Sequence, residues 1–201
     1  MSNALKFLIV LFLFAVFGMS CSNKKVKVQY ESAFQKRMNS LFKDASKSPL
    51  KAKDLKVFSS LSFFPIDSIF VVKAKLTPTP NSAYFDMKTN TERVSKERIF
   101  GVLSFRLLDK NVKLNVYQSI DSADVKSNYL FLPFLDNTNG LSTYGGGRYM
   151  DLIVPKSDSI WLDFNTAYNP YCAYNERYSC PIVPRQNYIP LAVQAGVKRF
   201  K

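Results

Sequence analysis

Residues 99–116 read IFGVLSFRLLDKNVKLNV, and this stretch decides the fold class. In its first half, alternate positions place on one face Ile99, Gly101, Leu103, Phe105 and Leu107. In its second half, the residues that alternate with polar positions are Val112, Leu114 and Val116. Asp109-Lys110-Asn111 supplies turn chemistry between the halves, so the stretch predicts an antiparallel β-hairpin.

Other short apolar segments, rich in Ile, Val, Leu and Phe, predict further strands. They are residues 68–76, 84–87, 93–94, 130–135, 150–154 and 160–164. Short strands separated by turns predict a mainly β (α+β) fold, either an antiparallel sandwich or a partly open barrel. The chain after Phe164 is rich in Pro, Asn and Tyr, which predicts a long ordered C-terminal loop.

One amphipathic helix is expected near the N-terminus. Its apolar residues recur at helical spacing at Phe34, Met38, Leu41 and Phe42, with polar residues between them. The pattern predicts a helix of about 15 residues that packs on the core, and a helix lying on a membrane is the alternative.

The first residues of the chain have the design of a signal peptide. Lys6 precedes an apolar run over residues 7–17, which is too short to cross a bilayer comfortably. Small residues at Gly18 and Ser20 precede Cys21, a pattern that fits cleavage after Ser20. A cysteine directly after the cleavage point resembles the lipobox of bacterial lipoproteins.

These features predict three parts: a signal peptide over residues 1–20, a lipidated Cys21 with a polar tether over residues 21–29, and one globular domain over residues 30–201. We therefore expect a lipoprotein of the bacterial cell envelope, held on a membrane outside the cytoplasm by its lipid anchor. Plain secretion and an uncleaved anchor are the alternatives.

The charge of the chain is strongly positive, at +13, and the basic excess lies in residues 24–56, next to the leader. Such a stretch is attracted to anionic headgroups, although a solvated linker and helix face explain it equally well. Nucleic acid is not an expected partner, because no basic–aromatic motif is present and the leader directs the chain out of the cytoplasm. The sequence has no histidine, which excludes Ser-His-Asp and Cys-His catalysis in their ordinary forms, and no cofactor is indicated.

The segment Thr143–Tyr149 places three glycines before Arg148. Consecutive backbone amides in such a turn can form an anion-binding concavity, and Arg148 could add a two-pronged contact to a carboxylate or phosphate. The spacing matches neither the Walker loop nor the dinucleotide fingerprint. The alternative is a β-bulge or sharp corner in which Arg148 pairs with a nearby aspartate.

A second polar cluster follows a predicted strand end, over Asp163–Asn169. Asn and Tyr side chains there could recognise a hydroxyl-rich ligand, or could instead tie down an irregular loop. With the glycine segment it defines the candidate binding residues. They are Tyr144, Gly145, Gly146, Gly147, Arg148, Tyr149, Asp151, Asp163, Asn165, Tyr168 and Asn169.

The loop Asp136–Gly140 has oxygen-bearing side chains at alternate positions, as calcium loops do. The closing glutamate of an EF-hand is missing, so Asp136 is only a weak metal candidate, and Asn139-Gly140 equally indicates a hairpin turn.

Cys172 and Cys180 are the remaining cysteines and lie eight residues apart. A disulfide, two buried thiols and one reactive thiol all stay open.

Several longer runs resemble the domain of unknown function 1684 family. They are LPFLDNTNG (132–140), TYGGGRYMDL (143–152), LDFNTAYNPYCAY (162–174), YSCPIVPRQN (178–187) and AGVKRF (195–200). The resemblance supplies no established activity. It implies that such proteins occur both as envelope lipoproteins and as apparently cytoplasmic proteins, so a disulfide cannot be the general reason for the cysteines.

Three functions remain in view. The first is a binding module for a small polar ligand, formed by residues 143–149 and 163–169. The second is a hydrolase, with Asp151 and Asp163 in acid–base roles or Cys172 as the nucleophile, so whether the chain is an enzyme stays open. The third is an envelope scaffold without a ligand.

Overall fold

The computed structural model describes residues 31–120 and 128–201. The expected signal peptide, Cys21 and the tether lie outside these residues. Within the described ranges, none of the helices has the length and apolar character needed to span a membrane.

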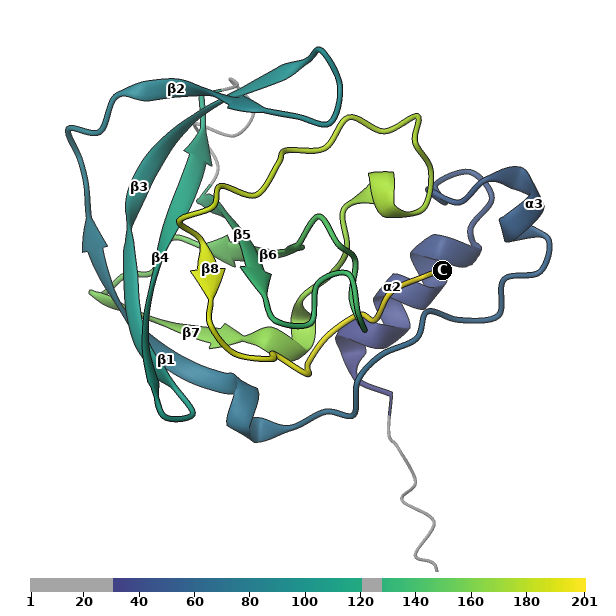
Figure 1. Cartoon of the computed structure of the whole chain (residues 1–201), viewed down its shortest axis with the longest axis horizontal. Coiled ribbons are helices and arrows are strands. Elements are labelled where there is room, and N and C mark those ends of the chain that lie inside the picture. The colour runs from purple at the N-terminus through teal and green to yellow at the C-terminus, as the bar shows by residue number, and fades with distance from the viewer. Residues whose placement is uncertain (1–30, 121–127) are drawn as a thin grey trace, which may run out of the picture. The chain divides into compact units, whose positions relative to one another are not determined.

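A single curled sheet dominates the described domain and confirms the mainly β prediction in its partly open barrel form (Figure 1). Its strands run in the order β6-β5-β4-β3-β1-β7, with β2 paired to β3 and β8 paired to β5. The strands are β1 (Val71–Pro78), β2 (Tyr84–Lys88), β3 (Val94–Leu107), β4 (Lys110–Ser119), β5 (Tyr129–Asp136), β6 (Arg148–Ile153), β7 (Ser159–Asp163) and β8 (Tyr188–Ile189). Among these described strands, all pairs are antiparallel except β5 with β8.

The β3–β4 hairpin forms as the alternation of residues 99–116 predicts, with Leu103 opposite Leu114 and Phe105 opposite Val112. The turn itself falls slightly earlier than expected, at Leu108-Asp109. Leu108 takes a φ of 52°, in the left-handed region that a tight connection between antiparallel strands requires.

The main core lies on the concave face of this sheet. Most of its buried residues come from β1 and from β3 to β7. The chain before β1 adds Phe70, and the chain after β7 adds Phe164, Ala167, Ile189, Val193 and Ala195. Since every strand offers only alternate residues to this core, residues of the opposite parity face outward. On β6 the buried Met150 and Leu152 point into the core, so Tyr149 and Asp151 lie on the outer face.

The predicted amphipathic helix is α2 (Ala33–Lys43). It begins at a capping box, in which the Ser32 hydroxyl accepts from the Gln35 amide at 3.2 Å and the Gln35 side chain accepts from the Ser32 amide at 3.0 Å. Its apolar face packs not on the sheet core but in a second cluster. The buried members of that cluster are Met38, Phe42, Leu50, Leu61, Tyr174 and Val197.

The remaining helical segments are short. They are α3 (Ala52–Leu55), η1 (Ser68–Phe70), η2 (Phe164–Thr166) and η3 (Tyr171–Ala173).

The chain after β7 is an ordered wrapping segment, as its composition predicts. It runs back between the sheet and α2 (Figure 1). Tyr168 pairs with Tyr149 of β6 through backbone hydrogen bonds of 2.8 and 3.0 Å. Further along, the Val197 amide donates to the carbonyl of Ala167, so the last part of this segment is bound to its first part. This segment therefore covers the outer face of β6.

Candidate functional site

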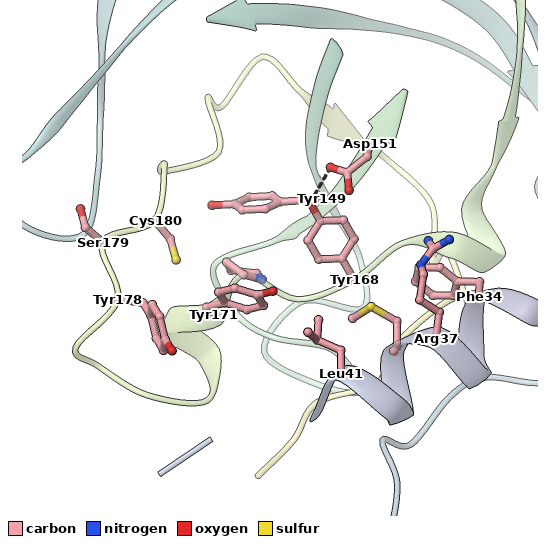
Figure 2. A pocket seen from close by; sticks show the side chains of 12 residues that line it. Phe34, Arg37, Leu41, Tyr149, Asp151, Tyr168, Tyr171, Tyr178, Ser179 and Cys180 are labelled. Atoms are coloured by element: carbon pink, nitrogen blue, oxygen red, sulfur yellow. Dashed lines mark hydrogen bonds between the residues drawn. The ribbon is translucent and has the colours of Figure 1, made fainter. Parts of the chain in front are cut away.

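A pocket of about 390 Å³ lies where α2, the outer face of β6 and the C-terminal segment meet (Figure 2). Its walls are mostly aromatic and apolar, with few polar groups. The lining residues are Phe34, Arg37, Met38, Leu41, Tyr149, Asp151, Tyr168, Pro170, Tyr171, Tyr178, Ser179 and Cys180. Binding sites for small molecules commonly have this composition, a concave apolar surface with a small number of placed polar groups.

Asp151 carries the only carboxylate among these lining residues. Its side chain is exposed, and its Oδ1 accepts two hydrogen bonds, from the hydroxyl of Tyr129 at 2.8 Å and from that of Tyr168 at 2.6 Å. The second oxygen, Oδ2, has no hydrogen bond from any described residue. The two phenols therefore fix the carboxylate in one orientation and leave one oxygen for another donor.

Two pairs of tyrosine rings shape the walls. Tyr149 and Tyr168 meet edge to face at 5.9 Å between centroids, and Tyr171 and Tyr178 do so at 5.3 Å. Burial raises the pKa of Tyr149, and burial followed by the negative charge of Asp151 raises that of Tyr168. Both rings are therefore neutral phenols at physiological pH.

The helix supplies the opposite wall. Arg37 is exposed and its guanidinium lies over the ring of Phe34, 5.5 Å from the ring centre. Met38 and Leu41 add apolar surface beside it. Arg37 takes part in none of the salt bridges formed by the described residues.

Cys172 and Cys180 are free thiols, and Cys180 lies on the side of the pocket away from α2 (Figure 2). Cys180 lines it, and its sulfur accepts the backbone amide of Cys172 at 3.2 Å. The interaction between the two cysteine side chains lowers the pKa of Cys172 to about 7 and raises the pKa of Cys180. The hydroxyl of Tyr144 lies 3.8 Å from the Cys172 sulfur.

Three of the sequence-predicted binding residues come together here: Tyr149, Asp151 and Tyr168. They derive from the two segments that we expected to meet, and the β-bridge between Tyr149 and Tyr168 brings these segments side by side. Tyr144 contributes indirectly, through its contact with Cys172.

Arg148 does not reach the pocket, because its side chain is fully buried on the core side of β6. The guanidinium pairs with Asp136 at 2.7 Å and donates to the carbonyls of Val193, at 2.8 Å, and Ala195. It also lies over the ring of Phe134. Of our two interpretations, pairing with an aspartate is therefore the one seen.

The three glycines before Arg148 also lie outside the pocket. Gly147 is buried at a φ of 91°, where an added Cβ would lie 2.7 Å from the carbonyl oxygen of Phe134. Gly145 and Gly146 are exposed. Gly147 thus shapes the entry into β6, and its role is conformational.

The polar residues after β7 tie down the wrapping segment. Asp163 accepts from the amide of Asn165 at 3.0 Å and from its side chain at 2.8 Å, and the same side chain donates to the carbonyl of Asp67 at 2.9 Å. Asn169 is buried and donates to the carbonyl of Lys198 at 2.9 Å. These three side chains fit the loop-stabilising alternative, and Asp163 does not line the pocket that holds Asp151.

Asp136, the weak metal candidate, is buried and already coordinated by protein donors. Oδ1 accepts from the amide and hydroxyl of Thr138, at 2.8 and 2.6 Å, and Oδ2 accepts from Arg148. Neither oxygen faces an open cation site. Over residues 31–120 and 128–201, no group of three or more His, Cys, Asp or Glu side chains is arranged to hold a metal ion.

The sequence did not point to eight of the twelve lining residues. The residues not foreseen are Phe34, Arg37, Met38, Leu41, Pro170, Tyr171, Tyr178 and Ser179. The spacing of the apolar residues in 34–42 predicted a helix but no binding site. Arg37 was one of the polar residues between them and was given no role. The excess of tyrosines after residue 143 was the one usable local signal for the rest.

Comparison with known proteins identifies relatives without a known activity. The family model described as "Protein of unknown function (DUF1684)" matches residues 56–198. The solution NMR structure of an uncharacterized protein from Haloarcula marismortui is 33% identical, with a TM-score of 0.66, and the match covers 82% of this chain and 89% of that chain. No curated protein matches. The chain therefore belongs to the DUF1684 family of proteins of unknown function.

Proposed function

We propose that this protein is an envelope lipoprotein whose β domain binds a small polar ligand in the Asp151 pocket. One observation carries the binding proposal: a carboxylate held by two tyrosine hydroxyls presents an unused oxygen at an aromatic cavity. The volume of about 390 Å³ lies within the range of roughly 300–1,000 Å³ that is usual for small-molecule sites.

The binding residues of this proposal are a revised set. Tyr149, Asp151 and Tyr168 are kept from the sequence prediction, and the walls from α2 and residues 170–180 are added. Arg148, Gly147, Asp163, Asn165 and Asn169 support the site by holding β6 and the wrapping segment in place.

Native mass spectrometry of the full-length protein, purified in mild detergent, tests the binding proposal. We expect a small molecule to accompany the wild type, to be lost from Asp151→Asn, and to stay on the control Asp158→Asn, whose side chain is exposed and lies outside the pocket. Circular dichroism checks that both variants fold. Retention on Asp151→Asn would overturn the site, and so would a wild type that carries no molecule and is stabilised by no compound of a fragment library.

The envelope part of the proposal is supported by the leader and by Cys21, which precede the described residues. Metabolic labelling with an alkyne-bearing fatty acid tests it. Label should enter the wild type in the membrane fraction and should be absent from Cys21→Ala. An unlabelled wild type in the cytosolic fraction would contradict the proposal.

A further inference from the structure

Two side chains of opposite charge line the pocket, Asp151 from β6 and Arg37 from α2. Neither has an ion-pair partner among residues 31–120 and 128–201, and they do not pair with each other. All other lining residues are uncharged, and the raised pKa values of Tyr149, Tyr168, Tyr171 and Cys180 keep those four so. The lining therefore offers one negative and one positive charge.

The surroundings of Asp151 suit a cationic amine. An ammonium group has only donors, and the open Oδ2 of Asp151 has only acceptor sites. The faces and edges of Tyr149, Tyr168 and Tyr171 line the same space, and aromatic faces attract cations. An alcohol could use the same oxygen, but it would gain neither the charge-assisted bond nor the contact with the rings.

The surroundings of Arg37 suit a carboxylate. A guanidinium presents paired N–H donors that match the two oxygens of a carboxylate. The ring of Phe34 supports one face of the Arg37 guanidinium, which restricts how the group can turn. Arg37 also makes a simple cation a poor ligand, because the cation would share the pocket with an unpaired positive charge.

From this juxtaposition we propose that the ligand is a small zwitterion with an apolar or aromatic body, of the amino-acid type. Its ammonium group binds Asp151, its carboxylate binds Arg37, and its body lies between the tyrosine rings. The inference rests on the proposed function, because it names the chemical class bound at the same pocket.

Isothermal titration calorimetry with three probes that share a phenyl ring tests the class. The probes are L-phenylalanine, which carries both charges, 2-phenylethylamine, which carries only the ammonium, and 3-phenylpropanoate, which carries only the carboxylate. We expect L-phenylalanine to bind the full-length protein at least about 10-fold more tightly than either other probe, since each lost charge-assisted bond weakens binding by about that factor or more.

Variants then assign each charge to its partner. Asp151→Asn should weaken the binding of L-phenylalanine by roughly 10-fold, because the charge of residue 151 is lost while its shape is kept. Arg37→Ala should remove the preference for L-phenylalanine over 2-phenylethylamine. Lys36→Ala is the matched control, since Lys36 is an exposed cation beside Arg37 that does not line the pocket, and it should leave all three affinities unchanged.

The outcomes separate this inference from the function on which it rests. If 2-phenylethylamine or 3-phenylpropanoate binds as tightly as L-phenylalanine, or if Arg37→Ala keeps the preference, the zwitterion is wrong while the binding pocket stands. If no probe binds but a co-purified molecule is lost from Asp151→Asn, the class is again wrong and the pocket again stands. If no probe binds, no molecule accompanies the wild type and no fragment-library compound stabilises it, both proposals fail together.

Discussion

Arg148 and Asp136 form an ion pair whose side chains are both inaccessible to solvent. Burial lowers the pKa of the Arg148 guanidinium, and the Asp136 carboxylate acts in the opposite direction. The Arg148 guanidinium also donates to the carbonyls of Val193 and Ala195, so this one side chain links the C-terminal segment to β5 and β6. An arginine that looked like a ligand contact is thus a structural clamp.

Replacing Arg148 by methionine should destabilise the protein by about 3–5 kcal/mol, because Asp136 would remain buried without its counter-charge. Urea unfolding followed by circular dichroism measures this free energy. The double variant Asp136→Asn/Arg148→Met should recover part of the loss, since no uncompensated charge remains and the new amide oxygen can still accept from Thr138. A single variant within about 1 kcal/mol of the wild type would contradict the clamp.

Cys172 is the residue whose chemistry should respond to pH. Its thiolate is stabilised by the Cys180 thiol and then by the Tyr144 hydroxyl, with a pKa of about 7. A lowered pKa means that the thiolate, the reactive form, appears at a lower pH than in a free cysteine.

Alkylation of Cys172 by iodoacetamide should therefore rise through about pH 7, while Cys180 reacts little. Cys180→Ala removes the main donor and should move the midpoint for Cys172 toward about 8.5, the value of a free thiol. Peptide mass spectrometry after timed alkylation follows each cysteine separately. An unchanged midpoint in Cys180→Ala would show that the Cys180 thiol does not stabilise the thiolate.

At the scale of elements, the turn before β6 sets the positions of the pocket residues Tyr149 and Asp151. Gly147 lies directly before the strand with a φ of 91°, and an added Cβ would lie 2.7 Å from both the carbonyl oxygen of Phe134 and the side chain of Val183. A side chain here would have to adopt a left-handed conformation and displace backbone at the same time. The glycine thus allows β6 to pair closely with β5.

Gly147→Ala should destabilise the protein by more than about 1 kcal/mol, through strain at positive φ and the clash with Phe134. Gly145→Ala is the matched control, because its Cβ would meet nothing closer than 3.7 Å. The two free energies of unfolding are compared by urea titration. Equal effects of the two substitutions would show that conformation at Gly147 is not limiting.

The helix α2 forms one wall of the pocket and does not pack on the sheet core. Phe42 is fully buried and meets the ring of Tyr174 edge to face at 4.7 Å, which anchors the helix to the wrapping segment. This anchoring positions the rest of the helix, with Phe34, Arg37 and Leu41, at the pocket. Amphipathic character predicted the helix, but its partner is a loop and not the sheet.

For the whole described domain, the last residues of the chain join two hydrophobic clusters. Ala195 is buried in the sheet core, and Val197 is buried in the cluster around α2. Between them, the carbonyl of Gly196 accepts from the amide of Phe64 at 3.0 Å. The C-terminal segment therefore links α2, which forms a wall of the pocket, to the core of the curled sheet.

Deleting residues 195–201 should lower the melting temperature substantially and loosen α2, because two buried side chains and an acceptor of Arg148 are lost. Deleting Lys201 alone is the control. It removes an ion pair with Asp54 whose lysine is exposed, and exposed pairs contribute only about 0–1 kcal/mol. Thermal unfolding by circular dichroism compares both, and a similar small effect of the two deletions would contradict the coupling.

The sequence by itself determined the elements, because their signals are local. Alternation over residues 99–116 specifies a hairpin, and the spacing of Phe34, Met38 and Phe42 specifies an amphipathic helix. The three residues Tyr149, Asp151 and Tyr168 were also among the predicted binding residues, because they lie in or beside the two polar and aromatic segments at 143–149 and 163–169.

Only the tertiary structure decided which of these residues face a pocket. Arg37 and Asp151 are more than a hundred positions apart and share a cavity because the wrapping segment brings α2 over the outer face of β6. The same segment covers Arg148 and makes it a clamp. A local pattern sets the backbone conformation and the face on which a side chain lies. What covers that face depends on contacts between distant segments, which no short stretch of sequence contains.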